Sequence, residues 1–274
     1  MKISFLGAGN LPEAIINALV HKLNFNCEDI AIYDKNKAQY DRYNNIDIVK
    51  TDTLREAVVY GEAIFLAVKP QNFAELLTWI KELDLDLTGK IFVSTAAAIS
   101  TDYIFDQLSQ NVAIIRTMPN TPIMIGEGMT ALCRNEYVSD NDFDEICGIF
   151  DRLGEIIIVG EDKMNKIISV NGSSPAYVYL FAEAMLEGAV RQGFTKEEAY
   201  GAIVQALYGS IMMLKDSDKE PRELIRAVAP PGGTTERALN SLEADKFVDI
   251  ISKAMQECTV RTDELAKIYT ETEA

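Results

Sequence analysis

The chain has 274 residues, of which 48% are hydrophobic and 25% are charged, a composition typical of globular proteins. Its net charge of −16 would repel nucleic acid and anionic membranes, and no apolar run approaches the roughly 18 residues of a membrane span. The four cysteines include no CxxC pair, so we expect no metal site and reduced thiols in a cytoplasmic protein.

The first 160 residues alternate short apolar runs with amphipathic stretches. The runs are rich in β-branched residues and lack polar alternation, which is typical of strands buried on both faces. Repeated strand–helix units predict a parallel sheet with right-handed crossovers. The predicted strands are 2–7, 30–33, 46–49, 63–68, 90–95, 112–117, 127–133 and 155–160, and predicted helices between them include 12–22, 35–43, 52–60 and 71–82.

After Gly160 the pattern becomes helical, with no convincing strand. The predicted helical stretches are 163–190, 195–215, 220–227 and 235–270. The fold class is therefore α/β, with a Rossmann-type parallel-sheet domain over residues 1–160 and an all-helical domain over residues 161–274.

The stretch FLGAGNLPEAI, residues 5–15, joins the first predicted strand to the first predicted helix. Gly7 permits a tight turn, and Gly9 lets a pyrophosphate approach the backbone at the helix N-terminus. Pro12 replaces the third glycine of the GxGxxG pattern, and proline suits a first helical turn. A GxG alone is a weak signal, but its place in a strand–helix–strand unit favours dinucleotide binding over a glycine turn without a ligand.

Asp34 ends the second predicted strand, in IAIYDKNK. A carboxylate there can accept hydrogen bonds from a ribose 2′-hydroxyl, which favours NAD. Lys35 and Lys37 follow it and could instead attract the 2′-phosphate of NADP. Asp34 could also be only the N-cap of the next helix. The sequence thus leaves the choice between NADH and NADPH open.

Three further loops follow predicted strands and should meet at the same edge of the sheet. They are LAVKPQN (66–72), STAAAIS (94–100) and RTMPNTP (116–122). In the first, Lys69 could face the cofactor or extend into solvent. In the second, small side chains let a ring or a ribose come close.

Acid–base chemistry has few candidates in this chain. Its one histidine, His21, ends the first predicted helix and is not expected to be catalytic, and the stretch 167–190 contains no lysine. The stretch VAPPGGTTERAL, residues 228–239, offers backbone amides and two hydroxyls at a helix start but no acid poised for catalysis. Reduction of a ketone normally needs a proton donor, whereas a protonated imine does not. This set of residues therefore suits an imine.

The stretch SPAYVYLFAEAMLEGAV, residues 174–190, is apolar all round its predicted helix. It could be the core of a single chain. The core of a dimer is favoured, because a helical domain of about 110 residues would otherwise expose this surface.

Six motifs occur in the order and spacing of one known family: GAGN, AVKP, STAAAIS, RTMPNTP, NGSSPAY and PPGGTT. From Met1 to about Lys267 the chain resembles pyrroline-5-carboxylate reductase. The resemblance implies a Rossmann domain, a helical domain that intertwines with a second subunit, and assembly as a homodimer or decamer. It implies an oxidoreductase of proline (amino-acid) biosynthesis that reduces 1-pyrroline-5-carboxylate to L-proline with NADPH or NADH.

The same resemblance implies a set of site residues. Gly232, Gly233, Thr234 and Thr235 would bind the substrate carboxylate, and the Thr235 hydroxyl would be catalytic, near the ring nitrogen. The loop of one subunit would meet the cofactor of the other. The implied cofactor-binding residues are Leu6, Gly7, Ala8, Gly9, Asn10, Leu11, Asp34, Lys35, Ala67, Val68, Lys69, Pro70, Thr95, Ala96, Ala97 and Asn120.

Three residues depart from the family pattern. Pro230 stands where the family has serine, which removes a hydroxyl from the substrate loop and could alter the range of cyclic imines. Ser174 replaces a common glycine at a helix start, where serine is well tolerated. Pro12 replaces a usual alanine.

Two other functions remain open from the sequence. The first is reduction of a different cyclic imine; a hydroxyacid dehydrogenase of this layout is disfavoured, because the expected lysine and histidine are missing. The second is a non-catalytic regulatory or membrane-competence paralogue, which the intact GAGN, AVKP and PGGTT motifs disfavour.

Overall fold

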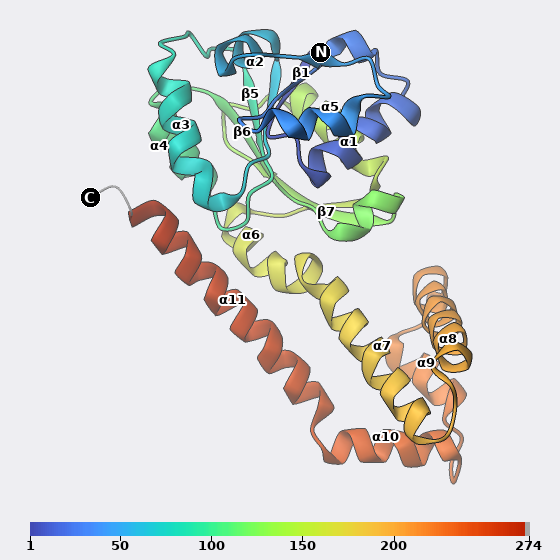
Figure 1. Ribbon diagram of the computed structural model, residues 1–274. Helices are drawn as coiled ribbons and strands as arrows, with labels where there is room; N and C mark the ends of the chain where they lie inside the picture. The colour runs from blue at the N-terminus through green and yellow to red at the C-terminus, as the bar shows by residue number, and fades with distance from the viewer. Residues whose placement is uncertain (272–274) are drawn as a thin grey trace. The chain divides into compact units, whose positions relative to one another are not determined.

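The computed structural model describes the backbone of residues 1–271 and the side chains of residues 1–269 (Figure 1). Its eight-stranded sheet has the order β3-β2-β1-β4-β5-β6-β7-β8. The strands are β1 (Ile3–Leu6), β2 (Ile30–Tyr33), β3 (Val49–Lys50), β4 (Ala63–Leu66), β5 (Ile91–Ser94), β6 (Ala113–Met118), β7 (Gly128–Arg134) and β8 (Gly154–Ile158).

Helices lie between most of these strands and follow the last one. The α-helices are α1 (Asn10–His21), α2 (Leu54–Tyr60), α3 (Phe73–Glu82), α4 (Thr101–Leu108), α5 (Asp140–Asp151), α6 (Glu161–Ile167), α7 (Ser174–Arg191), α8 (Lys196–Asp216), α9 (Pro221–Val228), α10 (Thr234–Ala244) and α11 (Phe247–Glu271). Four 3₁₀ helices and one π-helix complete the set: η1 (Cys27–Asp29), η2 (Lys37–Tyr43), η3 (Pro70–Asn72), η4 (Thr121–Ile125) and the π-helix η5 (Ile168–Gly172).

The central strands β1, β4 and β5 are buried on both faces, as their sequences predict, whereas the edge strand β8 is partly exposed. Phe5 and Phe65 lie on one face and stack with their ring centroids 4.6 Å apart, in a cluster shared with α1 and α5. Leu6 and Leu66 lie on the opposite face, in a cluster shared with α2, α3 and α4. Figure 1 shows these two groups of helices on opposite sides of the strands. The predicted α/β fold class is confirmed.

The sheet departs from the predicted parallel arrangement at one pair of strands. β6 and β7 pair antiparallel, with Ile115 opposite Arg134 and Met118 opposite Ala131, whereas the other paired strands run parallel. Only residues 119–127 connect β6 to β7, and a parallel crossover needs a dozen residues or more. The short connection therefore reverses the chain.

Three predicted helices also differ in detail. The stretch 35–43 forms the 3₁₀ helix η2. The stretch 163–190 is divided by the π-helix η5 between α6 and α7. The stretch 235–270 breaks between α10 and α11, where Lys246 adopts a positive φ of 57°. After β8, every regular element of the described chain is helical, as predicted.

The chain divides into two compact units. One comprises Met1–Ser173 together with the stretch from Cys258 onward, and the other is Ser174–Glu257. The division into domains at residues 160 and 161 stays a prediction, since the compact units are delimited at other positions. No helix within residues 1–271 is both long and apolar enough to cross a membrane.

Candidate functional site

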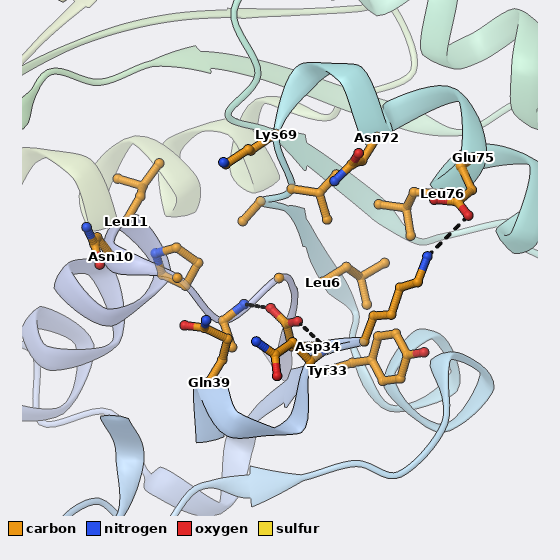
Figure 2. Close-up of a pocket in the computed structure, with 18 of the residues that line it drawn as sticks. Leu6, Asn10, Leu11, Tyr33, Asp34, Gln39, Lys69, Asn72, Glu75 and Leu76 are labelled. Atoms are coloured by element: carbon orange, nitrogen blue, oxygen red, sulfur yellow. Dashed lines mark hydrogen bonds and ion pairs between the residues drawn. The ribbon is translucent and has the colours of Figure 1, made fainter. Parts of the chain in front are cut away.

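A cavity of about 790 Å³ opens at the carboxyl ends of β1, β2 and β4 (Figure 2). In the strand order 3-2-1-4, the chain passes from β1 outward to β3 and then returns to β4 on the other side of β1. Such a reversal leaves a crevice at the carboxyl ends of the strands, where open α/β sheets bind their ligands. The cavity is lined by Leu6, Gly7, Ala8, Gly9, Asn10, Leu11, Pro12, Tyr33, Asp34, Lys35, Asn36, Gln39, Arg42, Ala67, Val68, Lys69, Gln71, Asn72, Glu75, Leu76 and Trp79.

Gly7 and Gly9 shape the floor of this cavity in different ways. Gly7 has a φ of +110°, and a Cβ added there would lie 2.5 Å from the carbonyl oxygen of Ala67. Gly9 is the N-cap residue of α1, without a side-chain capping bond, and a Cβ added there would meet nothing within 4 Å. Gly7 thus lets two loops approach closely, whereas Gly9 leaves space open before the first amides of α1. This arrangement fits the pyrophosphate of a dinucleotide, which binds at helix N-termini.

Asp34 joins the loop after β1 to the loop after β2. Its Oδ2 accepts a 2.8 Å hydrogen bond from the backbone N–H of Ala8, and its Oδ1 accepts one of 2.8 Å from the N–H of Asn36 (Figure 2). The interpretation of Asp34 as the N-cap of the next helix is wrong. Asn36 is the N-cap of η2 and accepts from the N–H of Ala38, because the helix begins later than the sequence predicts.

Of the two lysines that follow Asp34, only Lys35 lines the cavity. Lys35 lines the cavity; its Nζ lies 3.3 Å from Oε1 of Glu75 and 4.7 Å from the centroid of the Trp79 ring. Lys37 is not among the lining residues, and its ammonium donates to the carbonyl oxygens of Thr51 and Asp52. The structure therefore separates two cations that adjoin each other in sequence.

Most of the sequence-predicted cofactor residues lie in this cavity. Eleven of them line it: Leu6, Gly7, Ala8, Gly9, Asn10, Leu11, Asp34, Lys35, Ala67, Val68 and Lys69. Five others lie outside its lining: Pro70, Thr95, Ala96, Ala97 and Asn120. Pro70 begins η3, and Thr95 follows β5 with its hydroxyl donating to the carbonyl of Leu66. The role of all sixteen toward a cofactor stays a prediction.

Sequence reasoning missed the wall that α3 contributes. Asn72, Glu75, Leu76 and Trp79 line the cavity and stand at positions i, i+3, i+4 and i+7. That spacing places them on one face of a helix. The signal was present in the sequence, but the wall could be recognised only once α3 was known to follow the loop of Lys69 at the cavity rim.

Asn120 and Asn171 hold the loop after β6 by side-chain bonds to the backbone. Asn120 Oδ1 accepts from the N–H of Met129, and its Nδ2 donates to the carbonyl of Asn171. Asn171 Nδ2 donates to the carbonyls of Met118 and Met129, at 2.9 and 3.1 Å. Asn171 belongs to the π-helix η5, a rare form that frequently occurs at functional sites. The Asn120 amide is thus committed to shaping this loop.

Cys133 is excluded as a nucleophile by its surroundings. Burial, together with a hydrogen bond to Glu161, raises the pKa of the Cys133 thiol far above its usual range. The protonated thiol lies 3.0 Å from Oε2 of Glu161, whose Oε1 pairs with the buried guanidinium of Arg116 at 2.5 Å. This network joins α6 to β6 and β7.

The PPGGTT loop lies in the unit Ser174–Glu257 and leads into α10. Gly232 has a φ of +76°, and its N–H donates to Oε2 of Glu236 at 2.7 Å. The N–H of Gly233, the N-cap residue, donates to the carbonyl of Pro230 at 3.0 Å. Both glycine amides are therefore engaged within the loop. Thr234 and Thr235 begin the helix, where the N–H groups of the first turn have no intrahelical acceptor.

Glu236 is the residue of this loop that sequence reasoning passed over. Its carboxylate accepts a hydrogen bond from the N–H of Gly232, one of the amides expected to bind an anionic substrate. The stretch thus contains an acidic group next to the expected substrate position. The spacing of four residues from Gly232 was visible in the sequence, but the turn that brings the two together depends on the positive φ of the glycine.

Comparisons with known families cover both parts of the chain. Residues 161–265 match the family described as pyrroline-5-carboxylate reductase dimerisation, and residues 2–98 match that described as NADP oxidoreductase coenzyme F420-dependent.

Among curated proteins, pyrroline-5-carboxylate reductase of Escherichia coli K12 is 34% identical to this chain; the alignment covers 97% of this chain and 98% of the Escherichia coli protein. That of Corynebacterium melassecola is 30% identical over 97% and 98%. Two solved structures are similar throughout. Pyrroline-5-carboxylate reductase from Coxiella burnetii has a TM-score of 0.89 at 30% identity, covering 96% of this chain and 98% of its own. Pyrroline carboxylate reductase from Plasmodium falciparum, with NADP bound, has a TM-score of 0.86 at 26% identity, covering 97% and 98%.

Replacing Gly9 tests the open space before α1. Gly9→Val should place its side chain where the pyrophosphate would lie and weaken nucleotide binding by roughly 100-fold, which corresponds to about 3 kcal/mol. Stability should change by no more than about 1 kcal/mol, because an added Cβ meets no atom. Trp79 lines the cavity and is the only tryptophan of the chain, so quenching of its fluorescence measures binding.

Gly148→Val provides the control for this substitution. Gly148 lies in α5, and a Cβ added there also meets nothing within 4 Å, but it does not line the cavity. It should bind nucleotide as the unmodified protein does. Unchanged nucleotide affinity in Gly9→Val would refute the assignment of the glycine loop.

Proposed function

The chain belongs to the pyrroline-5-carboxylate reductase family, and we infer that it reduces 1-pyrroline-5-carboxylate to L-proline with NADH or NADPH, the final step of proline biosynthesis. It is an NAD(P)H-dependent oxidoreductase. The observation that carries this conclusion is the match of both the nucleotide-binding and the dimerisation parts, with relatives of this one activity similar over nearly the whole length. The open cradle at Gly9 supports the nucleotide assignment independently.

The chemistry places modest demands on the protein. When bound, the nicotinamide supplies a hydride to the carbon of the C=N bond. The π electrons of that bond move to nitrogen, so a protonated imine becomes a neutral amine without a further proton. The residues of the chain need only hold the substrate, position it and keep its imine protonated, which is catalysis by orientation.

We propose that the first turn of α10 holds the substrate carboxylate. The amides of Thr234 and Thr235 stand at the positive end of the helix dipole, which favours an anion. The Thr235 hydroxyl would contact the ring nitrogen. The sequence also assigns Gly232 and Gly233 to substrate binding. Their amides could bind substrate only after breaking their hydrogen bonds to the Glu236 carboxylate and the Pro230 carbonyl.

The dimerisation part supports assembly with a second copy, and we propose a homodimer that could associate further into a decamer. No residue of α7 is buried within the chain, although the helix carries many apolar side chains. Large exposed apolar residues of α7 and α8 include Tyr179, Leu180, Tyr200, Tyr208 and Ile211. Such a surface is typical of an interface. We also propose a cytoplasmic location, to which the four free cysteines are suited.

The direct test follows nicotinamide oxidation by the purified protein, with and without 1-pyrroline-5-carboxylate. Oxidation that depends on this imine is the expected result. If nucleotide binds but this imine is not reduced, a panel of other cyclic imines would separate a different imine reductase from a non-catalytic paralogue. Either of those outcomes would refute the proposed substrate.

The Thr235 hydroxyl can be tested by two substitutions. Thr235→Ala should lower kcat by roughly tenfold or more, since a hydrogen bond to a charged group contributes about 1.5–3 kcal/mol. Thr235→Ser keeps a hydroxyl and should retain most of the activity. Nucleotide affinity, measured by Trp79 fluorescence, should be unchanged in both variants. Equal turnover in the alanine variant would exclude a catalytic role for this hydroxyl.

The carboxylate of Glu236 should oppose binding of an anionic substrate. Glu236→Gln should therefore lower KM for the imine by roughly threefold to tenfold, in keeping with a repulsion of about 1 kcal/mol at an exposed site. Glu243→Gln is the matched control, because Glu243 lies on the same helix and pairs with Arg222. The idea fails if KM is unchanged in Glu236→Gln or falls equally in the control.

A further inference from the structure

We propose that Asp34 makes the nucleotide cavity selective for NADH over NADPH. This inference rests on the proposed function and specifies which form of the cofactor the chain uses. It concerns the cavity wall formed by the loops after β1 and β2, where Asp34 stands between Ala8 and Asn36.

The first argument is the hydrogen-bonding capacity of the Asp34 carboxylate. An ionised carboxylate only accepts hydrogen bonds, at about four positions on its two oxygens. The amides of Ala8 and Asn36 occupy one position on each oxygen and fix the side chain in the cavity wall. Each oxygen keeps a further position, which a ribose hydroxyl can fill by donating. A 2′-phosphate has no hydrogen to donate near neutral pH and adds negative charge beside a carboxylate.

The second argument is that the cations near Asp34 have partners elsewhere. The Nζ of Lys35 lies 3.3 Å from Oε1 of Glu75 and 4.7 Å from the centroid of the Trp79 ring, and both partners belong to α3. Lys37 donates to two backbone carbonyls and does not line the cavity.

Arg42 also lines the cavity, and its guanidinium is 2.8 Å from Oε2 of Glu13 and 2.9 Å from Oε1 of Gln39. Lys69 stands on the opposite rim, after β4, away from Asp34 in Figure 2. Among the described lining residues on the β2 side, each basic side chain therefore has an acidic partner, and Asp34 contributes an uncompensated negative charge.

The third argument is that Asp34 cannot turn away without cost. Its two bonds connect the glycine loop to the start of η2, so rotation would leave the amides of Ala8 and Asn36 without these acceptors. Losing such bonds to a charged acceptor costs about 1.5–3 kcal/mol each. The carboxylate is thus a permanent part of the wall, and any nucleotide must accept it as a neighbour.

Binding of NAD⁺ and NADP⁺ to the full-length protein tests this inference without any imine present. Quenching of Trp79 fluorescence gives both dissociation constants, and adenosine 5′-monophosphate against adenosine 2′,5′-bisphosphate isolates the effect of the 2′-phosphate. We expect NAD⁺ to bind roughly tenfold or more tightly than NADP⁺, since juxtaposed like charges are strongly unfavourable.

Two variants locate the selectivity. Asp34→Asn keeps one amide oxygen as an acceptor but loses the charge, and Asp34→Ser removes most of the side chain; both should bring the ratio of the two constants toward one. Asp41→Ser is the matched control, because Asp41 is exposed on the adjacent η2 and does not line the cavity. A general loosening of the fold would weaken both nucleotides and leave the ratio unchanged.

The outcomes separate this inference from the proposed function. A preference for NAD⁺ that is lost in both Asp34 variants supports the inference even if 1-pyrroline-5-carboxylate is not reduced. Equal or tighter binding of NADP⁺, or a preference for NAD⁺ retained in the folded Asp34 variants, would overturn it while leaving imine reduction intact. Failure of both nucleotides to bind would overturn the inference and the cofactor assignment together.

Discussion

The close approach of the Gly7 backbone to the carbonyl of Ala67 is the contact on which the nucleotide cavity depends. A side chain at Gly7 would come within 2.5 Å of that oxygen, and the positive φ of +110° is strained for any residue with a Cβ. Because Gly7 passes so near β4, α1 can begin at Asn10 with its first amides toward the cavity. The loop after β1 also comes close enough for Ala8 to bond Asp34. The open space before α1 and the contact between Ala8 and Asp34 therefore both depend on the close approach at Gly7.

Much of this arrangement could be predicted from sequence, because it depends on local patterns. Short apolar runs located the strands, and a GxG after the first strand located the cradle. The antiparallel direction of β7 was not predicted. The alternation of strands and helices suggested a parallel strand, but the connection from β6 is too short for a parallel crossover. The lysines beside Asp34 could not be interpreted either. Their partners, Glu75 for Lys35 and the Thr51 carbonyl for Lys37, lie 40 and 14 residues away. The sequence around a charged side chain does not indicate which distant residue will pair with it.

An acidic chain that binds anionic ligands has to rely on its backbone. With a net charge of −16, the protein opposes anions at long range, so local donors such as the amides at helix starts have to supply attraction. At both candidate sites a carboxylate already occupies one amide, Asp34 at Ala8 and Glu236 at Gly232. The two carboxylates act differently on a ligand. On the proposals above, Asp34 would accept ribose hydroxyls and so favour one nucleotide, whereas Glu236 would compete with the substrate carboxylate for the Gly232 amide.

The helical unit gives a physical reason for assembly to accompany catalysis. An apolar side chain buried from water contributes about 1.5–3 kcal/mol, and α7 leaves residues such as Tyr179, Leu180 and Phe181 exposed in the single chain. The same unit carries the PPGGTT loop, whose α10 depends on that unit for its position. A partner that covers α7 would stabilise the whole unit and thereby fix the loop. If α10 holds the substrate carboxylate as proposed, substrate binding and subunit association would be coupled through these helices, because a loosely held α10 cannot present its amides in a fixed direction.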